Sequence, residues 1–201
     1  MPVVHVVDDD EGLRVALDSL FRSVGYQTRT FGSAAEFMAS GRAGTAGCLV
    51  LDVRLPGVSG LDFQAQLGDA GVTMPVILMT GHGDIPMTVR GMKAGAIDFL
   101  PKPFREQDML DAVATALARD AQARAEREQS ETLRTRLATL SSREREVMAL
   151  VATGKMNKQI AYDLSLSEIT VKIHRGNAMR KMEARTLADF VKMAESLKLT
   201  T

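Results

Sequence analysis

Short apolar runs alternate with helix-like patterns over the first 118 residues of the chain. Five runs have the length and composition of buried strands: Val3–Val7, Tyr26–Phe31, Cys48–Leu51, Val76–Met79 and Ile97–Leu100. Between and after them, apolar residues recur every three or four positions, which predicts helices. The expected helices cover about residues 13–24, 34–39, 61–67, a stretch that begins near Asp84, and 109–117.

This alternation predicts an α/β fold. Near-continuous apolar strands separated by helices are typical of a parallel sheet that is covered on both faces. We therefore expect a doubly wound five-stranded parallel sheet. In such sheets the functional crevice lies at the carboxyl ends of the strands.

The last 64 residues show only helical patterns, which predicts a small all-α domain. Ser141 and Glu144 have the spacing of a capping box that opens a helix, and Ser167 is a candidate N-cap. A short helix, a tight turn and a longer helix together predict a helix-turn-helix. The expected helices after the first are 157–164, 169–182 and about 186–197, with Val171, Ala178, Met182 and in part Ile173 facing inward.

Residues 119–137 separate the two patterned regions. The stretch is rich in Ala, Arg, Glu and Gln and contains neither Pro nor Gly. Either an extension of the preceding helix or a flexible polar linker fits this composition. We expect three parts: residues 1–118, 119–137 and 138–201.

The charge is unevenly distributed along the chain. The chain has 25 Lys+Arg and 25 Asp+Glu in total. Residues 1–118 hold 9 Lys+Arg and 14 Asp+Glu, a net charge of −5, whereas residues 138–201 hold 11 Lys+Arg and 7 Asp+Glu, a net charge of +4. The front part could therefore hold a cation and the rear part could meet a polyanion. No apolar run approaches the length of a membrane span, so we expect no membrane partner. One Cys cannot form an internal disulfide, and a reducing cytoplasm is the expected setting.

Candidate chemistry follows the ends of the predicted strands. Asp8 and Asp9 come after the first strand, Asp52 after the third, Thr80 after the fourth and Lys102 after the fifth. Three carboxylates that meet at one sheet edge need a cation, and oxygen ligands suit Mg²⁺. A Lys and a hydroxyl beside them suit a phosphoryl group, which a carboxylate can accept covalently.

These residues lie in motifs that resemble a known domain. VVDDDEG (6–12), LDVRLPGVSG (51–60), MTGHGD (79–84) and DFLPKPF (98–104) match, in order and spacing, the receiver domain of two-component response regulators, which is flavodoxin-like. The resemblance implies that Asp52 is the phosphoacceptor, that Thr80 and Lys102 contact the phosphoryl group, and that Thr80 and Phe99 form the switch. It implies a Mg²⁺ site made by Asp8, Asp9, Asp52 and the backbone carbonyl of Arg54, and a cis Lys102–Pro103 bond.

The longer basic helix of the rear domain points to DNA. Its Lys172, His174, Arg175, Arg180 and Lys181 could contact a duplex, since the second helix of such motifs enters the major groove. Gly176 costs about 1 kcal/mol of helix propensity. A close backbone approach to DNA or to a neighbouring helix could explain it.

Residues 140–182 resemble the NarL/LuxR-type helix-turn-helix, and the whole chain resembles a FixJ-type response regulator. The expected DNA-binding residues are Asn157, Lys158, Thr170, Val171, Lys172, His174, Arg175 and Asn177. The implied partners are a sensor histidine kinase, double-stranded promoter DNA, RNA polymerase and, after phosphorylation, a second copy of the chain. The implied function is a transcriptional regulator, more often an activator, that is not an enzyme.

Two other classes of protein stay open at this point. A metal-dependent phosphatase with an Asp nucleophile needs a second acid two residues on, and Arg54 stands there instead. A DNA-binding or scaffold protein with a silent receiver would not need the complete set of strand-end residues.

Overall fold

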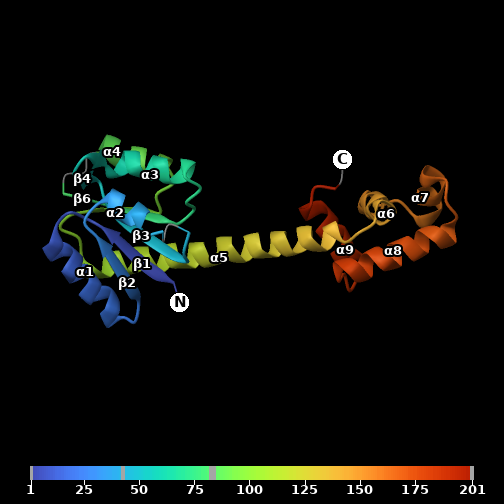
Figure 1. Ribbon diagram of the computed structural model, residues 1–201, viewed down its shortest axis with the longest axis horizontal. Helices are drawn as coiled ribbons and strands as arrows, with labels where there is room; N and C mark the ends of the chain where they lie inside the picture. The colour runs from blue at the N-terminus through green and yellow to red at the C-terminus, as the bar shows by residue number, and fades with distance from the viewer. Residues whose placement is uncertain (1, 42–43, 82–84, 200–201) are drawn as a thin grey trace. The chain divides into compact units, whose positions relative to one another are not determined.

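The computed structural model describes residues 2–41, 44–81 and 85–199 and divides the chain into two compact units, Met1–Arg124 and Ala125–Thr201. The first unit contains a five-stranded parallel sheet in the order β2-β1-β3-β6-β7 (Figure 1). Its strands are β1 (Val3–Val7), β2 (Gln27–Phe31), β3 (Gly47–Asp52), β6 (Val76–Thr80) and β7 (Asp98–Pro101). This confirms the fold class predicted for the front of the chain.

Helices cover both faces of the sheet (Figure 1). Helices α1 (Glu11–Ser23) and α5 (Glu106–Ala138) pack on one face through Leu17, Phe21 and Val113. Helices α2 (Ala34–Ala39), α3 (Gly60–Asp69) and α4 (Ile85–Lys93) cover the other. Asp84, where we expected the α4 helix to begin, and the rest of 82–84 lie outside the described residues.

The strands form where the sequence is continuously apolar. All six residues of β3 are buried, and Cys48 on this strand has no exposed surface. Burial raises the pKa of the Cys48 thiol to about 12, and the charge of Asp120 adds to the rise. The sequence pattern did not predict a short antiparallel hairpin of β4 (Arg54–Leu55) and β5 (Val58–Ser59), which follows β3 directly.

Helix α5 is fixed to the sheet at the end opposite the strand carboxyl termini. The Asp120 carboxylate is buried and accepts hydrogen bonds from the Gly47 N–H at 2.9 Å and from Arg124 Nε at 2.8 Å. Arg124 also donates to the carbonyls of Gly44 and Thr45. The helix continues without interruption to Ala138, so the stretch 119–137 is helical.

The second unit is all-helical. It comprises the end of α5 with α6 (Ser142–Ala152), α7 (Asn157–Leu164), α8 (Glu168–Met182) and α9 (Leu187–Ser196). These helices share one core, which includes Leu133, Val147, Ile160, Val171 and Phe190. The Ser141–Glu144 capping box and the Ser167 N-cap are both present, as predicted.

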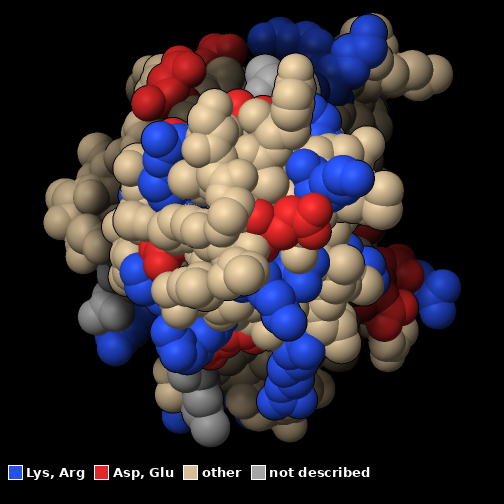
Figure 2. Space-filling model, turned by 90° about the vertical axis from the view of Figure 1, so that its right-hand side faces the viewer, with Lys and Arg blue, Asp and Glu red and all other residues tan. Residues whose placement is uncertain are grey.

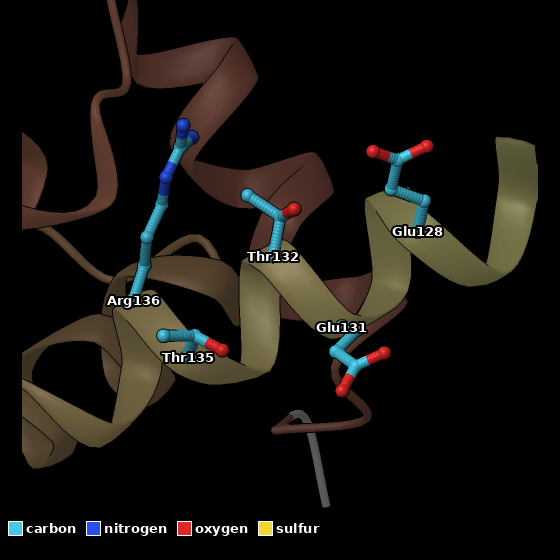
Figure 3. Close-up of a pocket in the computed structure, with 5 residues that line it drawn as sticks. All are labelled: Glu128, Glu131, Thr132, Thr135 and Arg136. Carbon is cyan, nitrogen blue, oxygen red and sulfur yellow. The ribbon is translucent and has the colours of Figure 1, made fainter.

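The last turns of α5 belong to this second core. Leu133 is buried, and the Arg136 guanidinium donates to the Met182 carbonyl and the Glu183 carboxylate at the end of α8. Figure 3 shows these turns of α5, where a hollow is lined by Glu128, Glu131, Thr132, Thr135 and Arg136. Within the described residues, no helix has the length and apolar character needed to cross a membrane.

Candidate functional site

Three carboxylates meet where the sheet topology predicts. Asp8 follows β1 and Asp52 ends β3, and these two strands are neighbours in the sheet. One carboxylate oxygen each from Asp8, Asp9 and Asp52 lies within 4.8 Å of the others. Asp8 and Asp52 are buried and Asp9 is exposed, so the cluster opens to solvent on one side.

Lys102 neutralises part of this charge. Its Nζ lies 2.6 Å from Asp8 Oδ2 and 3.2 Å from Asp52 Oδ2. The residue follows β7, and its backbone N–H donates to the Thr80 carbonyl at 2.6 Å, which fixes the loop to the end of β6. The Lys102–Pro103 bond is cis, as the resemblance implies.

The surroundings shift the pKa values of both groups. Burial raises the pKa of the Asp52 carboxyl, and the charge of Asp8 adds to the rise, while Lys102 and the Arg54 N–H act in the opposite direction. Burial alone would lower the pKa of Lys102. The hydrogen bonds that Lys102 makes with Asp8 and Asp52, together with the negative charges of these two residues, leave that pKa above its usual value. The ammonium of Lys102 therefore faces a carboxylate that lacks full solvation.

Thr80 and Phe99 lie on the neighbouring strands β6 and β7. Thr80 is fully buried, and its hydroxyl lies 3.9 Å from the Met87 sulfur of α4. Phe99 is partly buried and packs in the same apolar cluster as Met87. Gly81 is exposed, and nothing lies within 4 Å of the place where a side chain would begin. The end of β6 is thus in contact with α4, and Gly81 places no side chain beside Thr80.

Two supporting residues were missed by the sequence reasoning. Arg14 of α1 donates from Nη1 to the Asp8 carbonyl at 2.7 Å and holds the loop after β1. Gly60 opens α3 so close to the acceptor strand that a Cβ there would stand 2.1 Å from the Asp52 carbonyl oxygen. The glycine could have been suspected from its place in the motif, whereas the Arg14 contact depends on the loop geometry.

Asp10 is a helix cap rather than part of the cluster. Its carboxylate accepts from the Leu13 N–H at 3.1 Å at the start of α1, and its own N–H donates to Asp8 Oδ1 at 2.9 Å. The Arg54 N–H donates to Asp52 Oδ1 at 3.3 Å, so the backbone of Arg54 lies beside the acceptor strand end.

In the second unit, helices α7 and α8 place most of the predicted DNA-binding residues at the surface. Lys158 and Lys172 are exposed, and the Arg175 guanidinium donates to Asn157 Oδ1 at 3.0 Å, which joins the two helices. Figure 2 views the molecule from the side on which Figure 1 draws these helices, and shows Lys and Arg side chains spread among uncharged ones, with fewer acidic residues between.

Two expectations about α8 were wrong. Val171 has no exposed surface and packs in the core, which confirms its expected inward position and contradicts its place among the DNA-binding residues. Ile173, which we expected to face partly inward, is 56% exposed. The error is one of helix phase, because Ile173 lies about 200° around the helix axis from Val171.

Lys181, which the sequence placed among the basic residues of this helix, binds other residues of the second unit. Its Nζ lies 2.6 Å from the buried Glu144 carboxylate and 3.2 Å from the Thr139 carbonyl.

Comparison with known families agrees with this geometry. Residues 4–114 match the response regulator receiver domain, and residues 138–194 match the luxR family of bacterial regulatory proteins. The chain belongs to the two-component response regulators that join a receiver domain to a LuxR-type DNA-binding domain.

The chain matches curated relatives over most of their length, and these include proteins named as response regulators and as transcriptional regulatory proteins. The chain is 55% identical to nodulation protein W of Bradyrhizobium diazoefficiens, covering 97% of this chain and 86% of that protein. It is 42% identical to the transcriptional regulatory protein FixJ of Rhizobium meliloti, covering 95% and 94%. The solved structure of response regulator StyR matches with a TM-score of 0.86 and 48% identity over 96% of this chain and 98% of that one. Full-length FixJ from B. japonicum matches with a TM-score of 0.60 and 34% identity over 100% and 98%.

This particular chain is thus a DNA-binding regulator of transcription in a two-component system, and its family is one of transcription regulators rather than enzymes.

Proposed function

We propose that Asp52 accepts a phosphoryl group from a sensor histidine kinase and that this event controls promoter binding by the second unit. The observation that carries the proposal is the convergence of Asp8, Asp9, Asp52 and Lys102 at the carboxyl-end edge of the sheet. In the transfer, an Asp52 carboxylate oxygen forms a bond to phosphorus while the bond from phosphorus to the donor nitrogen breaks.

The acidic cluster fits Mg²⁺. Its donors are all oxygen atoms, and the exposed Asp9 side leaves room for the water ligands that Mg²⁺ usually keeps. We expect Asp8, Asp9, Asp52 and the Arg54 carbonyl to hold the ion, which supplies charge neutralisation to the transferring group. Lys102 neutralises the phosphoryl oxygens from the other side, because its ammonium already contacts Asp52.

Thr80 and Phe99 would convey the change to α4. When the Thr80 hydroxyl donates to a phosphoryl oxygen, it leaves the Met87 sulfur. Phe99 packs in the same cluster as Met87, so the ring can follow the displaced strand end. The added charge and this repacking are the kind of local event that biases a two-state element.

The output we favour is dimerisation through the face made by α4 and β7. Ile85, Val89 and Met92 of α4 are 82%, 44% and 45% exposed, an apolar set that association would cover. Two copies would present two DNA-binding units to paired half-sites and multiply weak contacts. Release of the second unit from the receiver is the alternative output, and contact with RNA polymerase would follow on the promoter.

A small-molecule phosphodonor tests the acceptor assignment. We expect acetyl phosphate with Mg²⁺ to label the full chain at one site, and Asp52→Asn or removal of Mg²⁺ with EDTA to abolish the label. Asp69→Asn, at an exposed position of α3, is the matched control and should label normally. Undiminished labelling of Asp52→Asn would show that another residue is the acceptor.

Light scattering tests the output. Beryllofluoride with Mg²⁺ stands in for the phosphoryl group on Asp52, and we expect the molar mass of the chain to double. An unchanged mass with beryllofluoride bound would refute dimerisation as the switch and favour release of the second unit.

A further inference from the structure

One face of α8 has no role in the fold of the second unit. Val171, Ala178 and Met182 have no exposed surface and define the side of the helix that packs on the core. With 100° of rotation per residue, Ile169 and Ile173 lie about 160° and 200° around the axis from Val171. Both isoleucines therefore point directly away from the core, one turn apart.

The exposure of these two side chains is large for isoleucine. Ile169 is 73% exposed and Ile173 is 56% exposed. Neither side chain is needed for packing, and a polar residue at either position would leave the core intact. An apolar pair on the outward face of a basic helix indicates a contact surface.

Gly176 continues this face one turn further along. It is exposed, and nothing lies within 4 Å of the point where a Cβ would stand. Close packing against a neighbouring helix therefore does not account for the glycine, although it weakens the helix. Its effect is to leave the backbone bare beside Ile173, so that a partner surface can approach closely.

The charges that flank the face identify the partner. Lys172 and Arg180 are exposed on the same helix, and Lys158 is exposed on α7. Residues 138–201 carry 11 Lys+Arg against 7 Asp+Glu. A basic rim around an apolar centre favours a polyanion that displays apolar groups. In the DNA major groove the apolar group presented by the bases is the C5-methyl of thymine.

We propose that Ile169 and Ile173 determine part of the sequence specificity by contacting thymine methyl groups, and that Gly176 permits the helix to approach them. The inference rests on the proposed DNA binding and assigns base reading to residues outside the set expected from the sequence. Lys158 and the other cations then position the helix on phosphates.

Removal of the methyl group alone provides the test. A duplex is first selected from random-sequence DNA by the full chain with beryllofluoride and Mg²⁺. Each thymine of that duplex is then replaced in turn by deoxyuridine, which differs only by the methyl. We expect the wild-type Kd to rise about fourfold at one or two positions, the effect of one lost apolar carbon.

Variants assign the contacts to residues. Ile173→Ala should bind the thymine duplex more weakly and should lose the thymine preference at one position, and Ile169→Ala should lose it at a different position. Lys158→Ala is the control and should weaken binding to thymine and deoxyuridine duplexes by equal factors. Gly176→Ala should make α8 more resistant to hydrogen exchange and yet bind DNA more weakly.

The outcomes separate this inference from the proposed function. If a duplex is selected but no deoxyuridine replacement changes the wild-type Kd, methyl reading is refuted while DNA binding stands. If Ile169→Ala or Ile173→Ala lowers the molar mass of the beryllofluoride-bound chain and leaves the thymine preference intact, the face is an interface between copies and the inference is wrong. If the chain selects no duplex, the proposed DNA binding itself fails.

Discussion

The pair formed by Glu144 and Lys181 should contribute measurably to the stability of the second unit. Glu144 is 4% exposed, and its carboxylate accepts from the Ser141 N–H at 2.8 Å and from Lys181 Nζ at 2.6 Å. Glu144→Gln keeps the shape and one amide oxygen for the capping box but removes the charge. The perturbation therefore isolates the charge-assisted contact to α8.

Its magnitude follows from the burial of the two groups. Hydrogen bonds to charged groups contribute about 1.5–3 kcal/mol. The Lys181 side chain is 38% exposed, so solvent screens part of the interaction. We therefore expect the lower end, a loss of about 1.5 kcal/mol. Glu146→Gln is the control, because its exposed i,i+3 bridge with Arg143 is worth less than about 0.5 kcal/mol.

The loss should depend on pH with a defined sign. The hydrogen bond from Lys181 lowers the pKa of Glu144 from its usual value of 4.5, and that from Ser141 contributes further. The stabilisation is therefore complete above pH 4.5 and is lost as the pH falls through the lowered pKa.

Hydrogen exchange measured by mass spectrometry on the full chain reports α6 and α8 separately from the sheet. We expect Glu144→Gln to lower the free energy of opening of α6 and α8 at pH 7 and to leave β1 and β3 unchanged. An effect no larger than that of Glu146→Gln would refute the assigned role of the pair.

Three further predictions concern the receiver. Gly60→Ala should destabilise the receiver by at least about 2 kcal/mol, since the new Cβ meets backbone atoms. Gly68→Ala in the same helix is the control, because its Cβ meets open space, and it should be neutral or stabilising. Equal urea midpoints of the two variants would contradict this prediction. Asp120→Ala should cost about 2 kcal/mol by removing the buried acceptor of the Gly47 N–H, and unaltered exchange of that amide would count against it. Asp52→Asn should be more stable than wild type at pH 7, because burial raises the pKa of Asp52 and the wild type loses stability as the pH rises through that pKa. The difference in the free energy of unfolding by urea should shrink toward pH 3.8, and a difference that stays constant with pH would exclude this cause.

Much of the receiver could be predicted because its signals are local. An apolar run predicts a buried strand, and parallel strands bring residues after their carboxyl ends to one edge. That reasoning placed Asp8, Asp52 and Lys102 together although 94 residues separate the first from the last. The acidic cluster was accessible in this way, and in the second unit the Ser141 capping box and the Ser167 cap were predicted from residue type and spacing.

Other features depend on contacts that no local pattern carries. The bond from Arg14 to the Asp8 carbonyl requires the final path of a loop. The use of Lys181 by Glu144 requires the crossing of α6 and α8, so a residue assigned to the basic face contributes to stability instead. The outward phase of Ile173 could have been computed from the period of the helix once Val171 was placed inside. The composition of residues 119–137 fitted a helix and a linker equally well.

The single Cys of the chain has a practical consequence. Cys48 is the sole thiol, it lies on the fully buried strand β3, and its pKa of about 12 keeps it protonated. An alkylating reagent can therefore modify it only when the strands around it separate. The rate of thiol modification of the unaltered protein, with or without beryllofluoride, would measure how often the sheet opens and whether the acyl phosphate analogue makes that event rarer.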